Sequence, residues 1–254
     1  MSRSRAHDRA RPSGGAPQLS LAERLKSITS WAALWIGEPG SITIGTGVSQ
    51  WSDSSGNGLH ATQGTGASQP SWTATSATKG YVQGNGTQGL LCSSASLAFL
   101  HSGAGMTIFV VYQQSGTVDN YVLGNQVGSR VNRGFSIARR TSPNASIAAG
   151  NGASGVFVST AIALGADGSA HRLIATYRTG TDPDVVTQSD GVAAGTVSEV
   201  NAPSALAAGA QFGICWGGGG VFGTTSKIYA VGLASSVLSA GQIAAIDSAL
   251  AGWS

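Results

Sequence analysis

The sequence has little charge. Asp, Glu, Lys and Arg make up 10% of its 254 residues, against about 25% in ordinary soluble domains. Its surface must be held in solution by hydroxyl and amide groups, and it can be buried against neighbouring molecules with few ions to desolvate. The chain also lacks any run of about 18 apolar residues, so we expect no membrane span. No apolar segment precedes Ser20, so we expect no secretory signal and synthesis in a cytoplasm.

Cysteine and histidine are scarce as well. Cys92 and Cys215 lie in separate apolar runs, and two distant cysteines are too few for a disulfide framework. We therefore expect both to be small buried apolar residues. The histidines are scattered, and no two of them have the spacing of metal ligands. They are His7, His60, His101 and His171.

The positive charge is concentrated near the N-terminus. Residues 1–29 carry six basic and two acidic side chains, a net charge of +4, whereas the rest of the chain carries eight basic and nine acidic ones. The body of the protein therefore lacks the basic patch that nucleic-acid binders present, and we do not expect nucleic acid as a partner.

Residues 1–19 are rich in Arg, Ser, Gly and Pro without periodicity, which indicates a flexible basic arm. Ser20 and Glu23 have the spacing of a capping box, which predicts a short helix within residues 20–30. We expect the arm and the apolar face of this helix to anchor the chain to another protein in a larger, oligomeric assembly. The anchoring residues are Arg3, Arg5, Arg9, Arg11, Leu21, Leu25 and Ile28.

From Trp31 onward the pattern is that of β-structure. Short apolar runs recur between clusters of Gly, Asn, Asp, Ser and Pro, which favours an all-β fold of two antiparallel sheets packed as a sandwich over residues 31–254. We expect at least ten strands, with helices only at the ends. The runs are Met106–Tyr112, Tyr121–Leu123, Phe135–Ala138, Val156–Leu164, Arg172–Tyr177, Val185–Thr187, Gln211–Trp216 and Lys227–Leu233.

Two local patterns add detail to this prediction. The segment Asp53–Gly58 follows a strand-like run and predicts a tight polar turn, because Gly accepts positive φ and Asp and Asn bond their own backbone. Ser239 and Gln242 form a second capping box, which predicts a C-terminal helix over 239–251. Its apolar residues fall along one face, so we expect this helix to cover the sandwich. They are Ile243, Ile246, Leu250 and Trp253.

Three parts of the chain together resemble LamG-like domains, the jelly rolls of the concanavalin A-like lectin and glucanase group. The first part runs from Ala33-Leu34-Trp35 through the polar turn to Gln69-Pro70. The second is His171–Tyr177 followed by Ser189-Asp190-Gly191, and the third is Lys227–Val231 followed by Leu238–Ile243. The resemblance covers roughly Trp31 to Trp253, and it implies a jelly-roll sandwich.

Domains of this kind are common among phage virion proteins and bacterial surface proteins. The resemblance, together with the low charge and the arm, implies a non-enzymatic structural protein of a tailed-phage virion, either a capsid decoration protein or a tail or fibre component. Such a protein would be made in the host cytoplasm and located in the virion. The alternatives are a carbohydrate-binding adhesion module and, third, a glycan-cleaving enzyme of the same fold.

The carboxylates argue against the enzyme. Glucanases that share this fold carry Glu-x-Asp-x-Glu on one strand, and that string is absent. The only closely spaced pair, Asp182 and Asp184, flanks Pro183, which favours a turn rather than a cleft. Glycoside hydrolysis needs two carboxyl groups across one bond. We therefore expect no enzymatic activity.

The same resemblance raises calcium as the one cofactor to consider, because such domains often hold Ca²⁺ at a rim through Asp, Asn and carbonyl oxygens. Candidate ligands are Asp182, Asp184 and Asp190. Asp53 and Asn57 could also contribute, but a tight turn needs the same two residues for itself.

A host surface glycan is the other ligand to consider, since exposed aromatic rings stack on sugars. Trp72 beside Pro70 and Trp216 before a glycine run are the least core-like aromatics. A cluster of arginines could grip an acidic glycan or a neighbouring subunit through its guanidinium groups. Equally, it could be a solvated hairpin edge whose charges block aggregation. Its members are Arg130, Arg133, Arg139 and Arg140.

Overall fold

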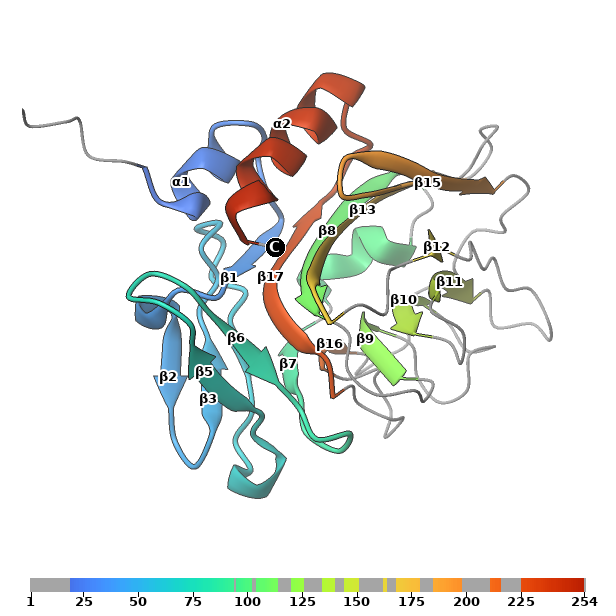
Figure 1. Cartoon of the computed structure of the whole chain (residues 1–254). Coiled ribbons are helices and arrows are strands. Elements are labelled where there is room, and N and C mark those ends of the chain that lie inside the picture. The colour runs from blue at the N-terminus through green and yellow to red at the C-terminus, as the bar shows by residue number, and fades with distance from the viewer. Residues whose placement is uncertain are drawn as a thin grey trace, which may run out of the picture.

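The computed structural model of the chain describes residues 19–93, 95–101, 104–113, 120–125, 134–139, 144–150, 162–163, 168–178, 185–197, 211–215 and 225–253. These residues form two antiparallel β-sheets packed as a sandwich, with a short helix near each end of the chain (Figure 1). The all-β sandwich predicted from the sequence is confirmed. The strands among these residues outnumber the ten that we expected.

Strands account for most of the elements, and short helical turns connect some of them. The helices are α1 (Leu21–Lys26) and α2 (Ala240–Leu250), and the 3₁₀ turns are η1 (Pro39–Ser41), η2 (Gly66–Ser68), η3 (Ala95–His101) and η4 (Ala251–Trp253). The strands are β1 (Ala33–Ile36), β2 (Ile42–Ile44), β3 (Val48–Trp51), β4 (Ala61–Thr62), β5 (Ser71–Ala74), β6 (Gly80–Gln83), β7 (Leu90–Ser93), β8 (Met106–Gln113), β9 (Asn120–Gly124), β10 (Gly134–Arg139), β11 (Asn144–Gly150), β12 (Ile162–Ala163), β13 (Ala170–Tyr177), β14 (Val185–Ser189), β15 (Val192–Val197), β16 (Gln211–Ile214) and β17 (Lys227–Ala234).

The eight-stranded sheet has the order β15-β14-β13-β8-β17-β6-β5, with β1 also paired to β17. The nine-stranded sheet has the order β12-β11-β10-β9-β16-β7-β4-β3-β2. Most of the predicted apolar runs coincide with strands. The run predicted at Val156–Leu164 lies largely outside the described residues, apart from β12.

Strand β17 organises the eight-stranded sheet. One of its edges pairs with β8, and the other pairs first with β6 and then with β1. Gly37 lies where β1 gives way to β6: its N–H donates to the carbonyl of Tyr229 at 2.8 Å, and its carbonyl accepts the N–H of Gly80 at 2.8 Å. A Cβ atom on Gly37 would lie 2.4 Å from the Gly80 oxygen and 2.6 Å from the Tyr229 oxygen. Only glycine allows these backbones to approach so closely.

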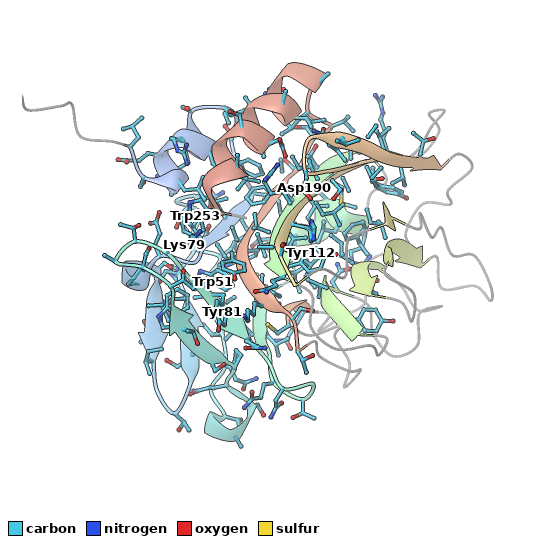
Figure 2. The ribbon with its side chains drawn as sticks, viewed as in Figure 1. Trp51, Lys79, Tyr81, Tyr112, Asp190 and Trp253 are labelled. Carbon is cyan, nitrogen blue, oxygen red and sulfur yellow. The ribbon has the colours of Figure 1, made fainter. Side chains whose placement is uncertain are left out.

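The main core lies between the sheets. The Trp35 ring of β1 stacks on Phe212 of β16, with centroids 5.7 Å apart and planes 7° apart, so these rings join one sheet to the other. Trp51, also fully buried (Figure 2), donates its indole N–H to the carbonyl of Ile36 at 2.9 Å. The prediction for the cysteines is confirmed, because Cys92 and Cys215 are buried and free. Burial raises the pKa of each thiol to about 12.

A second apolar cluster covers the outer face of the eight-stranded sheet, where α1 and α2 lie side by side over β17 (Figure 1). Helix α2 buries Ile246 and Leu250 completely, whereas Ile243 is only partly buried. Trp31 meets Phe109 of β8 edge to face at 5.1 Å. The predicted covering helix is therefore present. No helix among the described residues is long and apolar enough to cross a membrane.

The polar turn predicted at Asp53–Gly58 connects β3 to β4 and also holds β1. The Asp53 carboxylate accepts the backbone N–H of Leu34 at 2.9 Å and of Leu59 at 3.0 Å. The Asn57 amide donates to the carbonyl of Trp31 at 2.8 Å. Both side chains therefore hydrogen-bond to the backbone and hold the loop in shape. This supports the interpretation that Asp53 and Asn57 serve the turn.

One expectation about helices was wrong. We expected helices only at the ends, but η1, η2 and η3 lie between strands. In η3, Leu97 and Leu100 are both fully buried, and the backbone is kinked at Leu97. Such short turns carry too few residues to give a periodic signal in the sequence.

Candidate functional site

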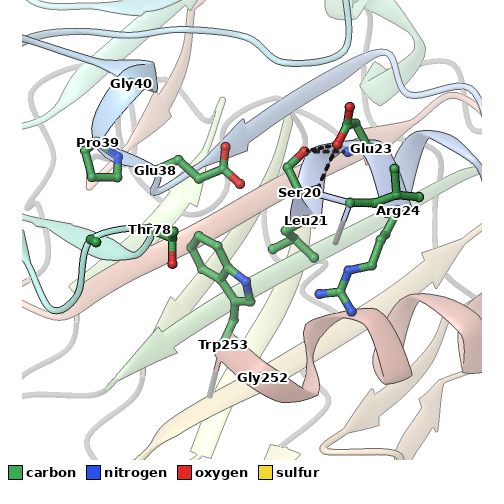
Figure 3. A pocket seen from close by; sticks show the side chains of 12 residues that line it. Ser20, Leu21, Glu23, Arg24, Glu38, Pro39, Gly40, Thr78, Gly252 and Trp253 are labelled. Atoms are coloured by element: carbon green, nitrogen blue, oxygen red, sulfur yellow. Dashed lines mark hydrogen bonds between the residues drawn. The ribbon is translucent and has the colours of Figure 1, made fainter. Parts of the chain in front are cut away.

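An open cleft of about 690 Å³ lies between α1, η1, the turn before β6 and η4 (Figure 3). Its walls combine apolar, hydroxyl and acidic groups. They include Leu19, Glu23, Glu38, Thr78, Gly252 and Trp253. Because Leu19 is the last residue of the predicted arm, the cleft lies where the arm joins the sandwich.

Helix α1 begins at the cleft because Ser20 and Glu23 form the predicted capping box. The Ser20 hydroxyl accepts the N–H of Glu23 at 3.2 Å, and the Glu23 carboxylate accepts the N–H of Ser20 at 2.8 Å. These bonds satisfy donors that the start of a helix leaves free. The backbone and side-chain bonds from Ser20 lower the pKa of the Glu23 carboxyl.

Four contacts fix α1 to the rest of the protein. Leu21 and Leu25 are buried in the cluster under the helices, with 3% and 0% of their surface exposed. Arg24 donates from its guanidinium to the carbonyl of Ala249 at 2.8 Å, at the C-terminal end of α2 where a cation is favourable. Gln242 of α2 donates to the carbonyl of Ile28 at 3.2 Å. The helix is therefore part of the sandwich.

This placement corrects one prediction. Leu21, Leu25 and Ile28 were expected to offer an apolar face to a partner, but the first two are buried within the chain and Ile28 packs against the same cluster. The outer face of the eight-stranded sheet provides the apolar surface that these residues need. The arm arginines lie outside the described residues, so their role stays a prediction. They are Arg3, Arg5, Arg9 and Arg11.

Glu38 is the second acidic residue of the cleft. Its carboxyl group is half-buried and points toward the start of α1, with the Trp253 ring below it in Figure 3. Burial raises the pKa of the Glu38 carboxyl, a backbone hydrogen bond from Leu21 partly offsets this, and the charge of Glu23 raises the pKa further.

Replacing Glu38 with Gln should stabilise the protein relative to wild type as pH rises. A carboxyl whose pKa is raised by folding contributes stability that is complete below its unfolded pKa of about 4.3 and is lost as pH rises through its folded pKa. Gln carries no such proton. Urea denaturation of both proteins across the acidic to neutral range measures the difference. Glu23→Gln is the control, since the pKa of Glu23 is lowered and its effect should have the opposite sign. A pH-independent difference for Glu38→Gln would mean that folding leaves the pKa of Glu38 unchanged.

Both carboxyl groups of the cleft interact with the start of α1, Glu23 through Ser20 and Glu38 through Leu21. A glycosidase needs a free acid and a second carboxylate on opposite sides of the bond. In this cleft the carboxylates instead hold the helix in place.

The sequence alone did not identify this cleft. Glu38 stands before Pro39-Gly40 and gives only a turn signal, and Trp253 was expected only on the apolar face of the terminal helix. Its walls come together because β1 pairs with β17 and α1 packs beside α2. Neither long-range contact has a local sequence signature.

Trp72 was predicted as an exposed aromatic residue for sugar binding, but its side chain is half-buried, and sugar binding by its ring stays a prediction. It pairs with Val82, a fully buried residue, so both side chains face the inside of the sandwich. Its half-buried ring covers Gly80, where a Cβ would lie 2.5 Å from two of the ring carbons. Trp72 therefore closes the edge of the core.

Most of the other predicted glycan-binding residues fall outside the described residues. Trp216, Arg130, Arg133 and Arg140 are among them. Arg139 lies in β10, opposite Asn120 and Ala145, and its side chain is not described. The arginine cluster thus stays a prediction.

The calcium prediction stays open for the same reason, because Asp182 and Asp184 lie outside the described residues. Asp190 is at the turn between β14 and β15, where one carboxylate oxygen lies 2.7 Å from Nδ1 of His171 and the other accepts the N–H of Arg172 at 2.9 Å. Among the residues that the structure describes, no group of three or more His, Cys, Asp or Glu could hold a metal ion.

Comparisons with known proteins identify the fold but no family. No family model and no curated protein matches the sequence. The structure is similar to Trypanosoma rangeli sialidase in complex with the inhibitor DANA, with a TM-score of 0.57, 11% identity, and coverage of 85% of this chain and 32% of that one. The same sialidase in complex with sialic acid gives a TM-score of 0.56 at 11% identity, with the same coverage.

A second group of similar structures is represented by the receptor binding domain of botulinum neurotoxin C/D mosaic serotype. It gives a TM-score of 0.58 at 10% identity, with coverage of 86% of this chain and 51% of that one. The chain thus spans about a third of the sialidase and half of the toxin domain. At these identities the likeness is one of fold. The comparisons thus agree with the two-sheet antiparallel β-sandwich of this chain.

Proposed function

We propose that the protein is a non-enzymatic structural component of a tailed-phage virion, either a capsid decoration protein or part of a tail or fibre. Its basic arm attaches it to other virion proteins, and the sandwich is displayed outward. The phage assignment rests on the resemblance of the sequence to LamG-like domains. The protein would be made in the host cytoplasm and act in the virion.

The observation that carries the attachment proposal is that the helix at the end of the arm is fixed to the sandwich. Helix α1, which directly follows the arm, is held by its capping box, by the burial of Leu21 and Leu25 and by the bond from Arg24 to Ala249. A force applied to the arm would therefore reach the core of the sandwich directly. If a flexible linker joined the arm to the sandwich, the displayed domain could move independently of the protein that holds the arm.

The partner of the arm follows from its charge. Six basic and two acidic side chains in residues 1–29 favour an acidic surface, and guanidinium groups pair well with carboxylates. We propose a virion protein with an acidic patch as this partner. The low charge of the remaining chain suits close packing among neighbouring copies.

A carbohydrate-binding adhesion module is the second candidate. It is favoured by the fold likeness to a sialidase solved with sialic acid and to a toxin receptor binding domain. In that case the sandwich itself, rather than the arm, would make the functional contact. A glycan-cleaving activity is the alternative that the likeness to a sialidase raises.

Three binding and activity measurements separate these candidates. Purified protein is mixed with virus particles that lack it, with host cells and with host polysaccharide. We expect binding to the particles, none to the cells and no release of reducing sugars. Binding to cells but not to particles would overturn the structural role in favour of the adhesin. Release of reducing sugars would overturn the non-enzymatic assignment.

A further inference from the structure

The outer face of the eight-stranded sheet, which carries α1 and α2, also carries polar side chains. Four neighbouring strands place one polar side chain each in a single row there. Ser71 of β5 pairs with Gln83 of β6, Gln83 pairs with Lys227 of β17, and Lys227 pairs with Gln113 of β8. Residues directly opposite each other in a sheet project from the same face. We call these four residues the polar row.

The residues adjacent in sequence to three members of the polar row show which face of the sheet the row occupies. Val82, Tyr112 and Ile228 are fully buried or nearly so in the core between the sheets. Since successive side chains alternate across a strand, the polar row projects away from that core. Ser71 is exposed, and the other three members are half-buried.

Aromatic residues border the polar row on the side of the helices. Tyr81 and Tyr229 meet at 5.5 Å with their planes 62° apart, and the ammonium group of Lys227 lies 4.9 Å from the centre of the Tyr81 ring. Lys79, two residues from Tyr81, donates to the carbonyl of Gly252 at 3.2 Å, beside the C-terminal residues (Figure 2). The border therefore combines an aromatic surface with two ammonium groups.

The amide groups of the row are held in place by the protein. Gln83 donates to the carbonyl of Thr225 at 2.7 Å. Gln113 accepts the hydroxyl of Tyr229 at 3.2 Å and donates to the carbonyl of Gly168. A side-chain amide has two N–H donors and a carbonyl oxygen with two lone pairs, so each retains bonding capacity. Because these side chains are already ordered, a ligand would lose little free energy in fixing them.

We propose that the polar row is a binding site for an acidic saccharide, a sugar chain that carries carboxylate groups. Its carboxylate would pair with the ammonium group of Lys227, its hydroxyls with Gln83, Gln113 and Ser71, and the apolar face of a ring with Tyr81. The repeat of about 4.8 Å between strands presents these groups at regular intervals, which suits a repeating polymer. The proposal does not depend on attachment through the arm, and each can fail without the other.

Charge supports a saccharide over other ligands. The row carries one ammonium group and no carboxylate, which favours a ligand that presents a single carboxylate to it. Nucleic acids bind through many phosphate contacts and need several cations. Hydroxyl and amide groups in a row are instead the partners that sugar hydroxyls require.

Affinity electrophoresis through gels containing polysaccharide tests the site. Polygalacturonate, alginate and polysialic acid serve as acidic probes, with dextran as the neutral control. We expect retardation by at least one acidic polymer and none by dextran, weakening as salt is raised. Lys227→Gln should lower the affinity about tenfold or more, since it removes a charge-assisted bond. Lys26→Gln, an equal change of charge on the exposed surface of α1, should bind as wild type does.

Two results would overturn the proposal: no retardation by any of the acidic polymers, or equal retardation of Lys227→Gln and Lys26→Gln. Melting temperatures of both variants show whether they are folded. If Lys227→Gln is destabilised, Lys227→Arg retains the charge and should restore binding. Failure of a folded Lys227→Arg variant to bind would also count against the site.

Discussion

Replacing Gly37 with Ala is expected to be among the most damaging single substitutions in this protein. The added methyl group would lie 2.4 Å from the Gly80 oxygen and 2.6 Å from the Tyr229 oxygen, both of which belong to the backbone. Relief requires β1 or β6 to move away from β17, which breaks sheet hydrogen bonds. Overpacking in a core typically costs about 1–3 kcal/mol and occasionally more, and we expect about 3 kcal/mol or more at this position. Urea denaturation measures the loss.

Gly40→Ala is the matched control for this substitution. Gly40 lies three residues further along, and a Cβ atom there would meet nothing within 4 Å. Its free energy of unfolding should stay close to that of wild type. If the two variants were equally stable, β1 and β6 would not meet on the edge of β17 as the structure has them.

Ile246→Ala is expected to have the second largest effect. Ile246 is fully buried in the cluster beneath the helices, and truncation of a buried Ile costs about 2–5 kcal/mol through lost burial and the remaining cavity. The melting temperature should fall clearly. The control is Ile44→Ala, the same substitution at a residue that is 56% exposed on β2.

Equal melting temperatures for Ile246→Ala and wild type would mean that α2 does not cover the sheet. A lower melting temperature for Ile246→Ala alone would support the packing of α1 and α2 on the eight-stranded sheet. This layer matters for the proposed function because it holds α1, the helix that follows the arm, through the bond from Arg24 to Ala249.

The sequence predicted well those features that are local. Capping boxes at Ser20 and Ser239 mark the starts of both α-helices, and each involves side chains only three residues apart. The polar turn after β3 was predicted because its residues satisfy their own backbone. Apolar runs located most strands, since alternation along a strand reports burial directly.

Features that depend on partners across the fold were predicted poorly. Helical spacing of Leu21 and Leu25 indicated an apolar face, but not that the chain itself would bury it. Trp72 was expected to be exposed because it stands beside a loop, whereas its register opposite Val82 turns it inward. The polar row joins residues 71, 83, 113 and 227, which only the strand order brings together.

Removing residues 1–18 tests the proposed attachment most directly. Leu19, Ser20 and the capping box remain, so the melting temperature should be nearly unchanged. Binding to particles that lack the protein should be abolished or strongly weakened, and binding of the full chain should weaken with salt because arginines make the contact. If the truncated protein binds the particles as tightly as the full chain at the same ionic strength, the anchoring surface lies on the sandwich and the arm is dispensable.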